Sequence, residues 1–122
     1  MELKDKAAFD LIVSERMKIR DNLIDSIKID IEYPFPKVEI RLIDKYLNNI
    51  KNKLIITLES VNEIRFNFFA NDPAYLEDFK LCFDEHKQVF YFSIDPDNST
   101  PEPVISDCNV FIAGKIKLLL VD

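Results

Sequence analysis

The chain has 122 residues, one glycine, one histidine and a formal net charge of −6. A single glycine excludes the phosphate-binding loop, the dinucleotide-binding turn and the nucleophile elbow, because each of these motifs needs several glycines. The acidic balance disfavours nucleic acid and anionic membranes as partners, because both attract clustered lysine and arginine.

The length fits one domain covering residues 1–122, and the hydrophobic fraction of 48% is ordinary for a globular protein. The N-terminus lacks an apolar run of signal-peptide length, and no window is long enough for a transmembrane helix. We therefore expect a cytoplasmic protein. Cys82 and Cys108 lie in apolar surroundings, which favours free thiols in a reducing compartment, with a single disulfide as the alternative.

The first predicted element is a helix from Leu3 to about Val13, because apolar residues recur there at helical spacing. The helical face consists of Leu3, Ala7, Ala8, Leu11 and Ile12. Where this helix ends stays open, because Ile19 and Leu23 fit both a longer helix and, with Met17, strand alternation.

Two strands are predicted next. Residues 27–33 alternate apolar and charged side chains, which is typical of a strand with one face in water. Pro34-Phe35-Pro36 ends that strand, because proline cannot donate to the hydrogen-bond ladder. Val38, Ile40 and Leu42 alternate in turn. The short link between the two strands predicts an antiparallel hairpin.

The middle of the chain is less regular. Residues 44–52 are predicted to form a loop. A third strand is expected at 54–58, a turn at 60–63 and a fourth strand at 64–68, before the breaker Asn71-Asp72-Pro73. Residues 75–83 fit a helix as well as a strand.

The last predicted elements are a turn at 84–87, a strand at 89–94 and a proline-rich loop at 95–103. Residues 110–121 are expected to form one bent strand or two, with Gly114 at a bend or bulge. The expected fold is therefore α+β, with an N-terminal helix followed by six or seven strands. These strands should form a mainly antiparallel meander or a partly closed sheet.

The negative charge is concentrated in one stretch. Residues 70–107 carry nine acidic side chains and two lysines, whereas residues 1–69 carry 12 acidic and 12 basic side chains. An acidic surface accelerates the association of a basic partner. We therefore take the candidate partner-binding residues to be Asp84, Glu85, Asp95, Asp97, Glu102 and Asp107.

Other chemistry is weakly indicated. A thiol nucleophile would need Cys82 or Cys108 beside His86, and Cys82 is near His86 only if that segment is a helix. Glu59 with Glu63, or Asp95 with Asp97, is a conceivable carboxylate pair for acid–base chemistry. The stretch that starts at Asp95 resembles a calcium loop but lacks its glycine and its bidentate glutamate. We expect no enzyme, no metal and no cofactor.

The strand patterns carry a family resemblance. The stretches 25–31 and 55–61, together with the closing alternation of Val110, Ile112, Ile116 and Leu118, resemble small immunity-type proteins of bacterial toxin–immunity systems. That resemblance implies a non-enzymatic cytoplasmic inhibitor that binds one toxin, and it implies no catalytic residues.

The leading hypothesis is thus a protein-binding module whose acidic loops occlude a basic surface on another protein. The alternative is a small-ligand-binding or structural domain with an aromatic-lined pocket, because aromatic residues concentrate between residues 66 and 92. A small hydrolase comes third. The oligomeric state is left open.

Overall fold

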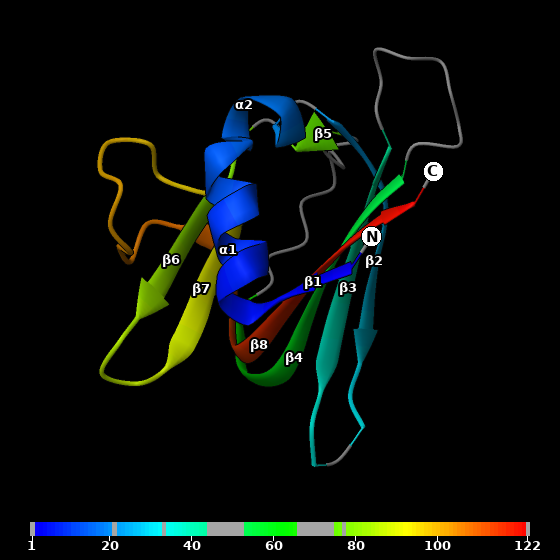
Figure 1. Cartoon of the computed structure of the whole chain (residues 1–122). Coiled ribbons are helices and arrows are strands. Elements are labelled where there is room, and N and C mark those ends of the chain that lie inside the picture. The colour runs from blue at the N-terminus through cyan, green and yellow to red at the C-terminus, as the bar shows by residue number, and fades with distance from the viewer. Residues whose placement is uncertain are drawn as a thin grey trace.

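The structure, a computed structural model, describes residues 2–20, 22–32, 34–43, 53–65, 75–76 and 78–121. Figure 1 shows helix α1 lying across the concave side of a strongly curved sheet. The elements in chain order are β1 (Glu2–Lys4), α1 (Asp5–Ser14), α2 (Arg16–Ile19), β2 (Asn22–Asp30), β3 (Lys37–Ile43), β4 (Lys53–Arg65), β5 (Tyr75–Leu76), β6 (Lys80–Asp84), β7 (Val89–Asp95) and β8 (Cys108–Val121).

The predicted α+β class is confirmed, with the helix first and antiparallel strands after it. Among the described residues, seven strands follow the order β5-β2-β3-β4-β8-β7-β6, and β1 pairs with the C-terminal part of β8. The sheet thus consists of two runs of sequential neighbours, β2-β3-β4 and β6-β7-β8. They are joined where the two longest strands, β4 and β8, pair with each other.

The N-terminal prediction is right in type and wrong at its boundaries. The helix starts at Asp5, because Leu3 belongs to β1 and pairs with Leu118 of β8. A second short helix, α2, continues to Ile19, so the helical alternative holds as far as Ile19, whereas Leu23 belongs to β2. Ala8, Ile12 and Ile19 are buried, which identifies the face that covers the sheet.

The predicted hairpin is confirmed as β2 and β3, but it is only partly buried. Ile29 is 37% exposed and Ile31 is 80% exposed. Alternation records which face of a strand is apolar, but no element covers the far end of this hairpin among the described residues, and Figure 1 shows that end projecting past the sheet. Tyr33 and residues 44–52 lie outside the described residues.

The predicted turn at 60–63 is wrong, because β4 runs unbroken from Lys53 to Arg65. The polar residues there mark a corner within the strand. Ser60 has a φ of 52°, and the register with β8 shifts between Val61 and Glu63. The described residues of this segment end at Arg65. The rest of the predicted fourth strand, residues 66–68, and the predicted breaker at 71–73 lie outside them.

Gly114 lies opposite Ser60 at this corner, so the predicted bend at the glycine is confirmed. The β8 residues that belong to the core cluster are odd-numbered before the corner, at Phe111 and Ala113, and even-numbered after it, at Ile116 and Leu118. The inward face therefore changes parity at residues 114–115, and both long strands bend together in Figure 1. A Cβ at Gly114 would lie 3.4 Å from the Ser60 Cβ, an ordinary contact distance, so the two strands approach closely here without excluding a small side chain.

The segment left open between helix and strand is extended. Its two ends belong to opposite edges of the sheet, because β5 pairs with β2 and β6 pairs with β7. Leu76 and Phe79 are fully buried or nearly so where the chain crosses between these edges. This crossing closes one end of the core.

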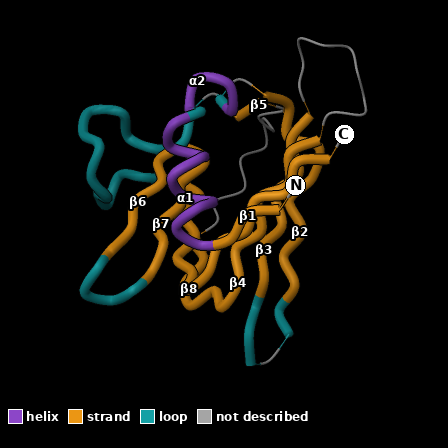
Figure 2. The backbone as a smooth tube through the Cα atoms, in the orientation of Figure 1, coloured by secondary structure: helices purple, strands orange, loops and turns teal. Residues whose placement is uncertain are grey.

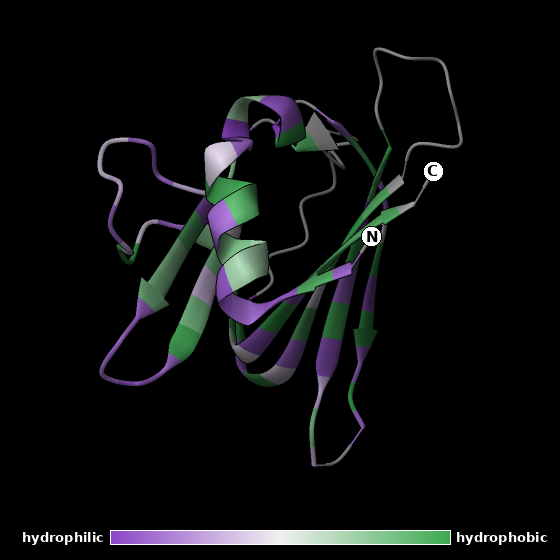
Figure 3. Ribbon diagram, in the orientation of Figure 1, coloured by the Kyte–Doolittle hydropathy of each residue, from purple (hydrophilic) through white to green (hydrophobic). Residues whose placement is uncertain are grey.

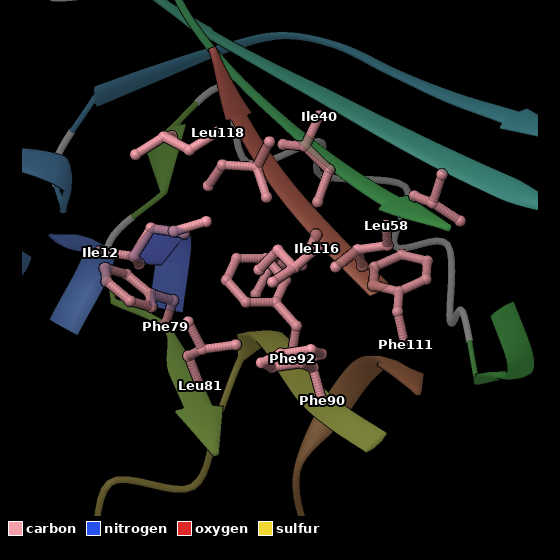
Figure 4. Packing of buried hydrophobic residues seen from close by; sticks show 14 of the residues in the cluster. Ile12, Ile40, Leu58, Phe79, Leu81, Phe90, Phe92, Phe111, Ile116 and Leu118 are labelled. Atoms are coloured by element: carbon pink, nitrogen blue, oxygen red, sulfur yellow. The ribbon is translucent and has the colours of Figure 1, made fainter. Parts of the chain in front are cut away.

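The core fills the space between α1 and the two bent halves of the sheet. Figure 4 shows Phe92, Phe111 and Ile116 converging there with residues from α1, β3, β4 and β6. Each of these side chains is shielded from water, and full burial of a large apolar side chain stabilises a fold by about 2 kcal/mol. Among the described aromatic residues between 66 and 92, Phe79, Phe90 and Phe92 therefore belong to the core.

Candidate functional site

The predicted acidic residues lie at the two ends of the β6–β7 hairpin. Asp84 ends β6 and Glu85 lies in the turn that follows, whereas Asp95 ends β7 and the other three lie in the loop that leads to β8. From Lys80 to Asp84 the strand spans about 13 Å at 3.3 Å per residue. Figure 2 shows the turn and the loop at opposite ends of these strands.

The turn at one end is ordered by Asp84. Its Oδ1 accepts hydrogen bonds from the backbone N–H groups of His86 (2.9 Å) and Lys87 (3.1 Å). Gln88 has a φ of 54°, and its side-chain amide donates to the Glu85 carbonyl at 2.7 Å. The Asp84 carboxylate therefore shapes the turn, while the Glu85 side chain is exposed.

The loop at the other end, residues 96–107, is organised around Asp107. The Lys80 ammonium and the Asp97 N–H donate to its Oδ1, each at 2.8 Å. The Tyr91 hydroxyl (2.7 Å) and the Val104 N–H (3.0 Å) donate to its Oδ2. The bonds from Lys80 and Tyr91 tie the loop to β6 and β7, and the bonds from the Asp97 and Val104 N–H groups close the loop on itself.

The Asp107 carboxylate is buried with its partner: its side chain is 0% exposed and that of Lys80 is 5% exposed. Burial alone raises the pKa of Asp107, but the hydrogen bonds from Lys80, Tyr91 and the backbone outweigh it and lower the pKa to about 2. Asp107 is therefore a structural anchor of the loop. This corrects the sequence prediction, which has it as a partner contact.

Asp97 holds the loop together from within. Its carboxylate accepts hydrogen bonds from the Ser106 hydroxyl and from the Ser99 N–H, and these lower the pKa of Asp97 to about 2. The Lys80 ammonium also donates to the Glu102 carbonyl at 2.7 Å. The loop thus has one defined conformation, which lowers the entropy cost of binding a partner.

The carboxylates that remain available are those of Glu85, Asp95 and Glu102, whose residues are all exposed. Sequence reasoning misses Ile105, an apolar residue in the same loop as Glu102. Ile105 is 94% exposed. It lies in a turn that Asp107 closes: the Asp107 carboxylate accepts a hydrogen bond from the Val104 N–H, and the Asp107 N–H donates one to the Val104 carbonyl. Its only signal in the sequence is an isoleucine in a loop of prolines and acids.

A groove on the outer face connects the two ends of the hairpin. Its cavity volume is about 610 Å³. Asp84 lies at the turn end and Pro103 at the loop end, and Tyr91 and Val89 lie between them on β7. Asn62, Glu63, Cys82, Phe83, Lys87 and Ile112 complete the lining. The acidic ends are therefore joined by a surface with an apolar middle.

Figure 3 shows the same division in hydropathy. The β6–β7 turn and much of the loop are hydrophilic, whereas the strands between them carry hydrophobic residues. Strand β7 carries three aromatic residues in a row. Phe90 and Phe92 face the core, and Tyr91 faces the groove with its hydroxyl bound to Asp107. Burial and that hydrogen bond raise the pKa of Tyr91.

The weaker chemical candidates are not brought together. Cys82 lies in strand β6, so the helical spacing that would bring it beside His86 is absent, and burial raises the pKa of its thiol. Both cysteines are free. Glu59 forms an ion pair with Lys117, and that hydrogen bond lowers the pKa of Glu59. Within the described residues no cluster of three or more His, Cys, Asp or Glu side chains has the geometry of a metal site.

No helix in the described part of the chain is both long enough and apolar enough to cross a membrane. No protein-family model, curated protein or solved structure matches this chain.

Proposed function

We propose that this chain is a non-enzymatic protein-binding module that engages a partner with a basic surface. The binding face consists of the loop 96–107, the β6–β7 turn and the groove between them. The observation that carries the proposal is the loop itself: a buried Lys80–Asp107 ion pair fixes it, and it presents Ile105 with exposed carboxylates nearby.

These features match what a protein interface needs. Binding energy concentrates in a few apolar anchors held on a rigid surface, and surrounding charges set the association rate and the choice of partner. Ile105 supplies the anchor, and Asp95 and Glu102 supply charge around it. The apolar middle of the groove, around Tyr91 and Val89, extends the contact area toward the turn.

The resemblance to immunity-type proteins favours one kind of partner, a toxin whose active site is basic. Inhibition would then be steric, because a surface that covers the toxin's active site excludes its substrate. This part of the proposal rests on strand patterns and on charge, and it assigns no catalytic residue to the chain.

Affinity capture from the source cell, followed by calorimetry with the purified partner, tests the proposal. A triple variant, Glu85→Gln with Asp95→Asn and Glu102→Gln, removes charge from the binding face. A matched variant, Glu2→Gln with Asp25→Asn and Glu32→Gln, removes equal charge elsewhere from exposed positions. We expect at least tenfold weaker binding for the first, about 1.4 kcal/mol, and less than a twofold change for the second.

The apolar anchor is tested separately. Ile105→Ala should weaken binding about tenfold, since a truncated anchor costs more than 1 kcal/mol. Ile31→Ala removes the same side chain from another exposed site, 80% exposed on the far hairpin, and should leave the affinity unchanged. Equal losses in both variants, or a captured partner that binds every variant alike at low and high salt, would refute the proposed face.

A further inference from the structure

A second hollow lies on the concave side of the sheet, and Phe83 lines both this hollow and the outer-face groove. Its cavity volume is about 620 Å³, within the range of small-molecule sites. It is lined by the first turns of α1, by the β6–β7 turn and by the corner of β8, through Asp5, Lys6, Phe9, Asp10, Phe83, Glu85, Gln88, Phe90 and Gly114.

Three phenyl rings from three different elements form one wall. The ring centroids of Phe83 and Phe90 lie 4.8 Å apart, and those of Phe9 and Phe90 lie 6.0 Å apart. Phe90 is 5% exposed and anchors the three rings to the core. Figure 4 shows Phe90 on the same strand as Phe92. Phe83 is 38% exposed, so a large aromatic surface faces the hollow without a cover.

The charge around these rings is negative. Asp5, Asp10 and Glu85 contribute carboxylates, and Lys6 contributes one ammonium group. The Asp5 carboxylate accepts a hydrogen bond from the Ile116 N–H at 3.3 Å. The side chains of Asp10 and Glu85 form no hydrogen bond or ion pair with the described part of the chain, so their charge is uncompensated there.

Aromatic faces and carboxylates select the same kind of ligand. A ring attracts a cation through its quadrupole, and a nearby carboxylate adds direct attraction and repels anions. A bare metal ion is a poor match, because the lining offers mainly hydrocarbon surface and the described residues hold no metal-binding cluster. We propose that this hollow binds a small organic cation of the alkylammonium class.

The only glycine of the chain provides a direct measurement. Gly114 lines the hollow, so labelling with ¹⁵N-glycine gives a spectrum with a single amide resonance from the site. Choline serves as the probe, and 3,3-dimethylbutan-1-ol serves as its uncharged control of the same shape. We expect a saturable shift with choline and about tenfold weaker binding of the alcohol. Equal binding of the two, or no shift with choline, would overturn the proposal.

Two variants locate the binding. Phe83→Leu removes a ring but keeps an apolar side chain, and it should weaken choline at least threefold; Asp10→Asn should weaken it by a similar factor. An unchanged affinity in both variants also overturns the proposal. Glu85 belongs to both proposed sites, so Ile105→Ala, which lies outside the lining of the hollow, separates them: it should weaken partner binding and leave choline binding unchanged.

Discussion

The corner at Ser60 and Gly114 divides the sheet into two halves, and the ion pairs on their outer faces differ in exposure. In the half that contains β2 and β3, ion pairs such as Arg41–Glu39 and Lys117–Glu59 lie at the surface, with side chains 21–44% exposed. In the half that contains β6 and β7, the Lys80–Asp107 pair is buried beneath the loop. Only the second half carries an ordered loop on its outer face among the described residues.

This difference shows which of the excess acidic residues stabilise the structure. A surface ion pair contributes little to stability, because water and salt screen it. A buried pair has no such screening, so its loss leaves a charge without a partner. The six candidate acids of the β6–β7 half therefore belong to two groups: Asp84, Asp97 and Asp107 order the turn and the loop, and Glu85, Asp95 and Glu102 face solvent.

The largest expected effect separates these two kinds of ion pair. Lys80→Met leaves the Asp107 carboxylate buried and unpaired, and should lower the free energy of unfolding by about 3–5 kcal/mol. Lys117→Met, the matched change at the surface pair, should lower it by less than about 1 kcal/mol. Urea unfolding measures both variants, and similar losses would contradict the distinction between the halves.

The next effect is a dependence on pH. The pKa of Asp107 is lowered from 3.8 to about 2 in the folded state. The unfolded chain therefore takes up a proton first as the pH falls, and stability that is present above about pH 4 is lost toward about pH 2. The loss at this site should be about 2 kcal/mol. Urea unfolding across this range should show it, and Asp107→Asn should remove that part of the pH dependence.

The smallest effect concerns the corner that separates the halves. Ser60 has a left-handed φ, so Ser60→Gly should raise the free energy of unfolding by about 0.5 kcal/mol. This is the backbone strain that glycine relieves in the folded chain, minus the entropy that it adds to the unfolded chain. Gly114→Ala should change stability by at most about 0.5 kcal/mol, because its new Cβ meets only the Ser60 side chain and backbone. In the Ser60→Gly background that cost should vanish. A double-mutant cycle by thermal unfolding checks this coupling, and strictly additive changes would argue against it.

Periodicity predicted most elements because it reports local burial. The alternation in β3, that of Ile116 and Leu118 in β8, and the helical spacing of Ala8 and Ile12 correspond to faces of the core, whereas Ile112 lines the outer-face groove. The turn expected at 60–63 failed for a physical reason. Polar residues end a strand only where the chain leaves the sheet, and here the partner strand bends with it.

The candidate site was predictable in part. The location of the acidic residues around the β6–β7 turn and the following loop is visible in the sequence: four lie within these segments, and Asp84 and Asp95 end the strands that lead into them. Their division into exposed and buried carboxylates was not predictable. Neither was the exposure of Ile105, because an isoleucine in a sequence is ordinarily read as a core residue.

The sequence by itself determined the secondary structure class, the apolar face of most strands and the stretch that carries the negative charge. These are properties of neighbouring residues, and one chain segment suffices to show them. Only the tertiary structure decided that β4 pairs with β8 and that Asp107 meets Lys80, 27 residues away. Such contacts depend on desolvation and packing between distant segments, which no local pattern records.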